Sequence, residues 1–441
     1  MIPRRISNPR ARGRRGSAGG GALRPAAIAF LAVTLLLLSP HQGAGYFPIT
    51  SSGVSLSWNG ADQPVTYVIQ SAGSGDIPDE SDDLALRLAF RRWEDSSGSS
   101  IAFLEDTSAD ANRTDFGAFD IHLILFDESN QTGYFPGGST VVALTPITFN
   151  LATGRIVDAD ILFNGGANSF STDKTPGTFD IQSVATHEIG HFIGLDHGAS
   201  CASTMFPFAA LARVRQRSLT DDDRGGARHI YSGGPATGTI SGTLVRQSNG
   251  TPVAGAHLVA VNSDGVVATG TYSEANGAFA IAQLPTGSYT VYAEPLDGPV
   301  AGSNLSSTIG ASAATDFGTT YVGGNSSPSS IVVIASTVSS IGNFGVLGPS
   351  GNNLTSCSDN PVLATRGAST VFAAIGTGLG ATDTLAITGP GITIDNSSYF
   401  NAGGVEWHQV DITTAANAPL GPRNLEVTAL SGDLTLLTAT L

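Results

Sequence analysis

The pattern of this 441-residue sequence changes abruptly near residue 232, and the change limits the folds open to it. Upstream, stretches with apolar residues at helical spacing alternate with short β-rich stretches. Downstream, β-rich stretches recur between turn signals such as Asn249-Gly250 and Asn276-Gly277, and helical periodicity is almost absent. A Gly-Gly-Pro breaker at residues 233–235 separates the two parts. We therefore expect a mixed α and β region followed by all-β regions.

The charge balance excludes one class of partner. The sequence holds 36 acidic and 21 basic residues, and seven of the basic residues are arginines within the first 24 positions. The rest of the chain therefore carries 14 basic residues against 36 acidic ones. Because phosphate binding needs clustered lysine and arginine, we expect no nucleic-acid partner.

The arginine-rich start has the layout of an export signal. It is followed by an uncharged apolar run at residues 26–38 and by small residues at positions 43–45. This order predicts a signal peptide over residues 1–45, and hence a secreted, extracellular protein; an uncleaved signal anchor is the alternative. No later stretch has the roughly 20 apolar residues of a membrane-spanning helix, so we expect no span after cleavage.

The upstream region is expected to be an α+β unit over residues 46–232. Helices are predicted at residues 82–93, 181–195 and 219–231, with Leu84, Leu88 and Trp93 as apolar positions of the first and Asp180 as the N-cap of the second. Strands are predicted at residues 65–69, 120–126, 139–145 and 158–163.

The downstream part is expected to hold two β-sandwiches. The first covers residues 236–298 and the second residues 344–441. Residues 299–343, rich in Gly, Ser and Thr, form either a linker or additional strands. The two cysteines, Cys201 and Cys357, lie in different regions, and either an inter-domain disulfide or two separate thiols fits this spacing.

The chemistry is concentrated in the segment that reads His-Glu-Ile-Gly-His-Phe-Ile-Gly-Leu-Asp-His at residues 187–197. On a helix, His187 and His191 lie one turn apart and face the same way, so both can bind one metal ion. Gly194 can adopt a positive φ that ends the helix and lets His197 supply a third ligand. Three imidazoles leave one position open for water, which is the arrangement of catalytic zinc, and Glu188 is placed to act as a base on that zinc-bound water.

This extended motif resembles that of the metzincin zinc metallopeptidases, and further details resemble the matrixin-like branch. Met205, eight residues after His197, matches the Met-turn of that family, and Asp222, Asp223 and Tyr231 match its C-terminal helix. The resemblance implies a zincin-like catalytic domain with a mixed, twisted sheet and three helices. No cysteine precedes Cys201, so the cysteine-switch propeptide of matrixins is absent from this sequence.

The resemblance also implies a substrate cleft. The edge strand beside the cleft falls on residues 139–144, so Val141, Val142 and Ala143 would contact an extended polypeptide substrate, and Pro207 would belong to the wall of the specificity pocket. Phe206 and Phe208 favour an apolar side chain in that pocket.

A second metal is a weaker expectation. Asp158 and Asp160 point to one face of a strand and could bind Ca2+, although a solvated acidic face is favoured. His122 lies in an apolar strand, where a packed role is favoured over a ligand role.

Two functions follow from these features. The first is a secreted, monomeric zinc metalloendopeptidase. The second is an extracellular adhesion or matrix-binding protein whose zinc domain is secondary or inactive. The downstream regions resemble carboxypeptidase-regulatory-like and immunoglobulin-like modules, for which spacer or substrate-docking roles are expected.

Overall fold

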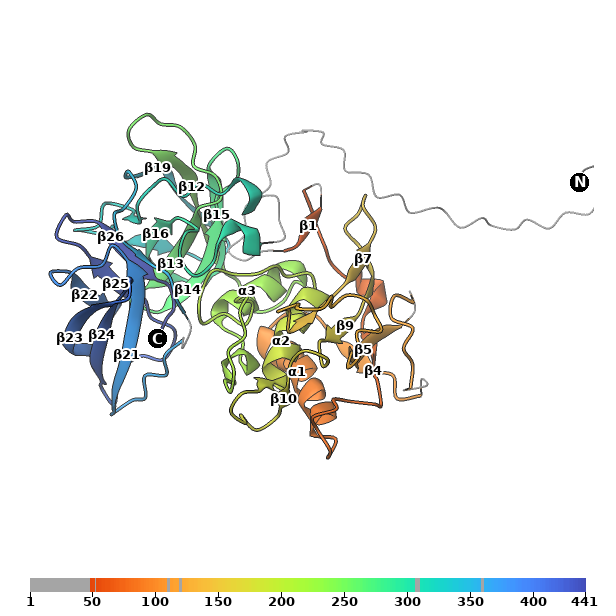
Figure 1. The fold of residues 1–441 in the computed structure, drawn as a ribbon. Helices are drawn as coiled ribbons and strands as arrows, with labels where there is room; N and C mark the ends of the chain where they lie inside the picture. The colour runs from red at the N-terminus through yellow and green to blue at the C-terminus, as the bar shows by residue number, and fades with distance from the viewer. Residues whose placement is uncertain (1–47, 52, 109–111, 119–120, 306–309, 358–360) are drawn as a thin grey trace, which may run out of the picture. The chain divides into compact units, whose positions relative to one another are not determined.

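The structure, a computed structural model, describes residues 48–51, 53–108, 112–118, 121–305, 310–357 and 361–441 (Figure 1). The predicted signal peptide lies outside these described residues. Among the residues described, every helix is too short or too polar to cross a membrane.

The main sheet of the upstream region has the strand order β4-β3-β5-β9-β6. The strands are β3 (Val65–Ile69), β4 (Phe103–Glu105), β5 (His122–Phe126), β6 (Ala143–Leu144) and β9 (Ile161–Phe163). Pairing is parallel from β4 through β9, and β6 runs antiparallel to β9 at the edge. The expected edge strand is therefore present, although it is only two residues long.

Smaller strands surround this sheet. They are β1 (Thr50–Ser51), β2 (Val54–Ser55), β7 (Ile147–Phe149), β8 (Ile156–Ala159), β10 (Phe170–Ser171) and β11 (Phe179–Asp180). The prediction of one continuous strand over residues 158–163 is wrong, because two strands share this stretch. The chain leaves the β7–β8 pair at Asp160 and enters the main sheet as β9, so the stretch belongs to two sheets.

The three predicted helices are confirmed as α1 (Ser81–Ser97), α2 (Ile181–Phe192) and α3 (Asp221–Ile230). The predicted buried face of α1 is partly wrong, because Leu84 and Leu88 are exposed. The stripe that enters the core consists of Ala85, Leu86, Ala89, Phe90 and Trp93. Trp93 is fully buried, and its indole Nε1 donates a hydrogen bond to the carbonyl of Thr186 on α2 at 2.8 Å. This bond and the surrounding apolar contacts fix α1 against the helix that carries the motif.

The first sandwich consists of two sheets around an apolar core. One has the order β15-β12-β19, and the other has β14-β13-β16-β17 with β18 also paired to β16. The strands are β12 (Gly238–Arg246), β13 (His257–Asn262), β14 (Val267–Tyr272), β15 (Ala278–Leu284), β16 (Gly287–Glu294), β17 (Thr320–Tyr321), β18 (Ile331–Val333) and β19 (Val338–Val346). Strands β17 and β18 and the start of β19 come from the Gly-, Ser- and Thr-rich stretch.

The second sandwich pairs a sheet of order β20-β21-β24-β23 with one of order β22-β25-β26. Its strands are β20 (Asn353–Leu354), β21 (Ser369–Thr377), β22 (Thr384–Ile387), β23 (Ile392–Ala402), β24 (Val405–Thr414), β25 (Leu425–Thr428) and β26 (Leu434–Leu437). The cysteines form an inter-domain disulfide, since Cys201 of the upstream region is bonded to Cys357 of this sandwich.

Helix α3 contacts the first sandwich through a carboxylate. Asp222 Oδ1 accepts hydrogen bonds from Thr269 Oγ1 at 2.8 Å and from the amide of Gly270 at 3.0 Å, both on β14. Burial, followed by the neighbouring charge of Asp223, raises the pKa of Asp222 to about 6.

This raised pKa predicts a pH-dependent effect of Asp222→Asn. The carboxylate is harder to ionise in the folded chain, so wild-type stability falls as the pH rises from about 4 through 6. The asparagine side chain of the variant retains the acceptor oxygen but carries no charge. We expect the variant to be more stable than wild type above pH 6 by about 1 kcal/mol, after allowance for solvent reaching a half-buried group. The gain should vanish near pH 4.

Thermal unfolding between pH 4 and pH 8, with metal chelated from both proteins, measures this difference. The control is Asp221→Asn, which removes the neighbouring carboxylate, an exposed one paired with Arg224. Equal melting-temperature profiles for Asp222→Asn and wild type across this range would contradict the prediction.

Candidate metal centre

Helix α2 places three of the motif side chains on the floor of a cleft. Its N-terminus is capped by Asp180, whose Oδ1 accepts from the amide of Ser183 at 2.8 Å, as predicted. His187 and Glu188 are buried near its C-terminal end, and His191 follows one turn later. Because α2 is packed on almost every side, these side chains have fixed positions.

Gly194 ends the helix as predicted, with a φ of +95°. Any other residue there would strain the backbone, and its Cβ would also lie only 2.3 Å from the carbonyl oxygen of Leu56. The turn returns the chain over the helix and brings His197 back to the first two imidazoles. The ring centroids are 4.8 Å apart for His187 and His191, 5.2 Å for His187 and His197, and 4.7 Å for His191 and His197.

Each imidazole is fixed through its Nδ1 atom by a backbone carbonyl. His187 Nδ1 lies 2.8 Å from the oxygen of Thr204, His191 Nδ1 lies 2.7 Å from that of Leu195, and His197 Nδ1 lies 2.6 Å from that of Asn304. A carbonyl oxygen can only accept a hydrogen bond, so each Nδ1 carries the proton and each Nε2 presents a lone pair.

The three lone pairs converge in a way that suits a cation. Nε2 of His191 and Nε2 of His197 are 3.2 Å apart, and one nitrogen from each of the three residues lies within 4.8 Å of the others. Two acceptors at this separation repel unless a cation lies between them. Burial lowers the pKa of His187 to about 3 and also lowers the pKa of His191 and His197, so all three rings are neutral at pH 7. Neutral imidazoles in this arrangement fit a tetrahedral Zn2+ with one position left over.

Met205 forms the apolar floor beneath the histidines. It is buried in the same core cluster as Trp93, and its sulfur packs directly on Gly190 of α2. A Cβ at position 190 would lie 2.1 Å from the Met205 sulfur and 3.1 Å from Cζ2 of Trp93. The glycine inside the motif therefore permits this contact.

Asp223 of α3 fixes the Met-turn. Its carboxylate accepts from Ser203 Oγ at 2.6 Å and from the amides of Thr204 and Met205 at 3.0 and 3.1 Å. Since the Thr204 carbonyl accepts from His187, Asp223 is linked to the His187 ring through one residue.

Tyr231 and Trp58 fix the other end of the motif. The Tyr231 hydroxyl donates to the carbonyl of Ile193 at 2.9 Å, and Trp58 Nε1 donates to that of Phe192 at 2.9 Å. Both carbonyls belong to the end of α2, where the helix has no further amides to pair with them.

Glu188 lies at the cleft beside the histidines. Its Oε2 accepts a hydrogen bond from Thr145 Oγ1 at 2.7 Å, and burial raises the pKa of Glu188 to about 7. Thr145 directly follows β6, so the edge strand orients the carboxylate.

The cleft contains the residues expected from the sequence. Val141, Val142 and Ala143 line it, as do Phe206, Pro207 and Phe208. Phe206 is buried and Phe208 is half exposed, which gives this wall an apolar character.

Asp158 and Asp160 do not form the solvated face that we favoured. Both are buried. Asp158 Oδ1 lies 3.2 Å from His122 Nδ1, while Asp160 accepts from the amides of Leu123 and Gly117 at 2.7 and 2.6 Å. Within the described part of the chain, the only group of three or more potential ligands that converges is the histidine triad. Calcium binding by the two aspartates stays a prediction.

His122 packs as expected. Its ring lies 4.7 Å from that of Trp58 and 5.9 Å from that of Phe192.

Thr145, Gly190 and Asn304 were missed by the sequence analysis. Gly190 had a usable signal, because glycine inside a helix is destabilising and indicates close contact. Thr145 and Asn304 had none, since they lie 43 and 107 residues from the groups that they contact.

Comparison with known families defines the class. Residues 57–232 match the matrixin family, and residues 239–317 match the carboxypeptidase regulatory-like domain. The chain therefore contains a matrixin domain, which holds the histidine triad, followed by a carboxypeptidase regulatory-like domain.

Individual relatives agree with the first assignment. The chain is 29% identical over 217 residues to the hatching enzyme of Paracentrotus lividus, covering 47% of this chain and 32% of that protein. It is 32% identical over 164 residues to metalloendoproteinase 1 of Glycine max, covering 36% and 48%. The chain thus spans about a third of the length of the first relative and about half of the second.

Solved structures are more distant. The major pilin subunit of Bacillus cereus aligns with a TM-score of 0.16 at 13% identity, over 45% of this chain and 66% of the pilin. The Bacillus anthracis TIE protein aligns with a TM-score of 0.18 at 10% identity, over 46% and 31%. Scores this low support no assignment of fold or function.

The contact between Gly190 and Met205 predicts the effect of Gly190→Ala. Alanine favours a helix over glycine by about 1 kcal/mol, so propensity alone would stabilise the variant. The added methyl group instead overlaps the Met205 sulfur, and overpacking costs typically 1–3 kcal/mol. We expect a lower melting temperature and zinc binding weakened roughly tenfold, measured by competition with a chromophoric chelator. Gly60→Ala, where a Cβ meets no atom within 4 Å, is the matched control; a stabilised Gly190→Ala protein would disprove the close contact.

Proposed function

We propose that this chain is a secreted zinc metalloendopeptidase. The observation that carries the proposal is the convergence of three imidazole Nε2 lone pairs beside a buried carboxylate in an open cleft. The matrixin domain and its metalloendoproteinase relatives support the same activity. Secretion rests on the arginine-rich and apolar start of the sequence.

The histidines, Glu188 and Thr145 would have different roles in peptide hydrolysis. His187, His191 and His197 would hold the zinc ion, which supplies Lewis-acid polarisation of a carbonyl and lowers the pKa of water. Glu188 accepts the proton of the attacking water and transfers it to the leaving amine. Thr145 orients Glu188 by its hydrogen bond to Oε2.

The cleft suits an extended polypeptide. Strand β6 lies at the edge of the sheet, so a substrate strand can add beside it through backbone hydrogen bonds. Phe206, Pro207 and Phe208 line the cleft and favour an apolar substrate side chain. The adhesion hypothesis has no comparable support, because it gives no role to the buried Glu188.

Replacement of Glu188 tests the activity. Glu188→Gln removes the proton acceptor and leaves the three ligands, so we expect peptide hydrolysis to fall by roughly 10³-fold while zinc stoichiometry stays at one. Rates on casein and on a short fluorogenic peptide, each with and without chelator, measure the loss. Glu80→Gln, an exposed position before α1, is the control. Two results would refute the proposal. One is a wild-type rate that the chelator does not lower, and the other is a Glu188→Gln rate equal to that of wild type.

Replacement of Thr145 tests how Glu188 is oriented. Thr145→Val has nearly the same shape but cannot donate, and a hydrogen bond to a charged group is worth about 1.5–3 kcal/mol. We expect kcat/KM to fall at least tenfold with zinc affinity unchanged. Thr145→Ser should restore most of the rate; a serine variant as slow as the valine variant would instead indicate a packing role.

A further inference from the structure

The third metal-binding histidine differs from the other two in what holds it. The carbonyls that accept from His187 and His191 belong to Thr204 and Leu195, within the matrixin domain. The carbonyl that accepts from His197 belongs to Asn304, which follows strand β16 of the first sandwich. One of the three orienting bonds therefore comes from outside the matrixin domain.

The Asn304 carbonyl is held in a short 3-10 turn, η3 (Gly302–Asn304). The Asn304 side chain accepts from the amide of Ala301 at 2.8 Å, and the Asn304 amide donates to the Ala301 carbonyl at 2.9 Å. Gly302 packs on the next 3-10 turn, η4 (Gly310–Ser312), so closely that a Cβ at position 302 would lie 2.2 Å from the Gly310 carbonyl oxygen. Because that oxygen belongs to the backbone, any side chain at position 302 must displace the turn.

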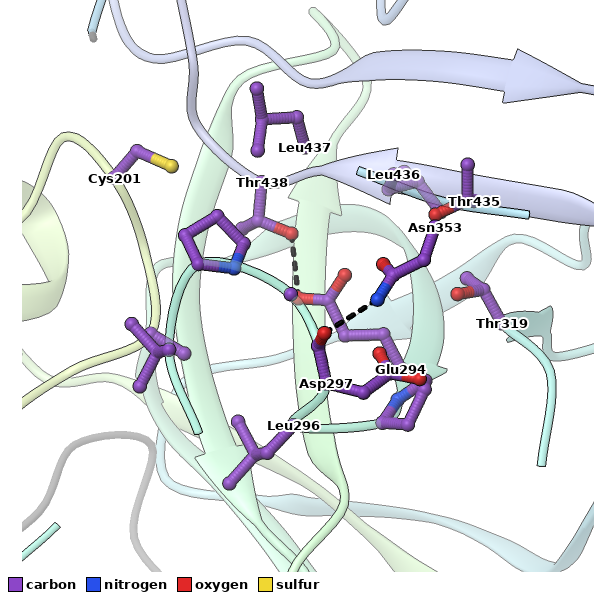
Figure 2. A pocket seen from close by; sticks show the side chains of 15 residues that line it. Cys201, Glu294, Leu296, Asp297, Thr319, Asn353, Thr435, Leu436, Leu437 and Thr438 are labelled. Carbon is purple, nitrogen blue, oxygen red and sulfur yellow. Dashed lines mark hydrogen bonds between the residues drawn. The ribbon is translucent and has the colours of Figure 1, made fainter. Parts of the chain in front are cut away.

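The segment between His197 and Met205 is bonded to the second sandwich and lines a pocket with residues of the first. Cys201 is bonded to Cys357, and its amide donates to the Thr438 carbonyl at 3.1 Å. Cys201 and Thr438 also line one pocket with Glu294, whose carboxylate accepts from Thr438 Oγ1 at 2.7 Å (Figure 2).

Apolar side chains continue this contact toward the cleft. Phe206 of the cleft wall shares a buried cluster with Leu296, Val300 and Leu305, which lie on both sides of η3. The segment that carries the third ligand and the cleft wall thus packs on the two sandwiches through Cys201 and Phe206, and on the matrixin core through Met205.

We propose that the η3 turn completes the metal centre and that Asn304 is a positioning residue for His197. Its carbonyl keeps the proton on His197 Nδ1 and fixes the ring plane, so that Nε2 points toward Nε2 of His191. Outer partners of this kind typically change metal affinity 10- to 100-fold. The inference rests on the proposed zinc site, and it replaces the spacer role expected for the first β-region.

The experiment displaces the turn without touching a ligand. Gly302→Ala in the full chain should weaken zinc binding 10- to 100-fold in competition with a chromophoric chelator, and should change the visible d–d spectrum of the cobalt-substituted protein. Gly348→Ala is the matched control, because it lies just after β19 of the first sandwich and its Cβ would meet no atom within 4 Å. The control should bind zinc and cobalt like wild type.

A second variant tests the same role of η3 in case Gly302→Ala does not fold. Asn304→Ala adds no atoms and removes only the side-chain acceptor for Ala301, so the turn loosens while the carbonyl remains. We expect several-fold weaker zinc binding with an unchanged melting temperature of the metal-free protein.

The outcomes separate the two proposals. A folded Gly302→Ala or Asn304→Ala protein with wild-type zinc affinity and cobalt spectrum would overturn the role of η3 and leave the peptidase proposal intact. A wild-type chain that binds no stoichiometric zinc would overturn both.

Discussion

The site depends on one repeated interaction, the hydrogen bond from an imidazole Nδ1 to a backbone carbonyl. It occurs three times, at 2.6–2.8 Å, and each time it fixes both the tautomer and the plane of a ring. Without these bonds, nothing would direct the lone pairs of three neutral rings toward one another. Much of the surrounding fold can be understood as the means of placing three carbonyls.

Each carbonyl is placed by a different part of the fold. The turn at Gly194 presents the Leu195 oxygen, and this turn needs a positive φ and no side chain. Asp223 fixes the Met-turn that presents the Thr204 oxygen, so this buried carboxylate on α3 acts on the position of His187 without contacting its ring. The η3 turn presents the third oxygen from the β-region.

The sequence predicted what is local. Residues 187–197 specify a helix, a glycine turn and a third histidine within 11 positions, so their convergence follows from helix geometry. The three helices were predicted because apolar spacing and the Asp180 cap are local signals as well. The exposed Leu84 and Leu88 could not be recognised, since they repeat at helical spacing just as the buried stripe does. Thr145 and Asn304 act across 43 and 107 residues, and nothing in one sequence records such contacts.

The hydrogen bond from His197 to the Asn304 carbonyl requires the two sandwiches to be firmly attached to the matrixin domain. A flexible spacer would leave the Asn304 carbonyl averaged over many positions, and a hydrogen bond of 2.6 Å does not survive that averaging. Three ties prevent it: the Cys201–Cys357 disulfide, the bonds from β14 to Asp222, and the apolar cluster under Phe206. The disulfide and the apolar cluster act on the segment that carries His197, so their free energies would be linked to that of metal binding at this histidine. If attachment of the two sandwiches increases metal affinity, then metal binding must strengthen the attachment of the sandwiches by the same free energy.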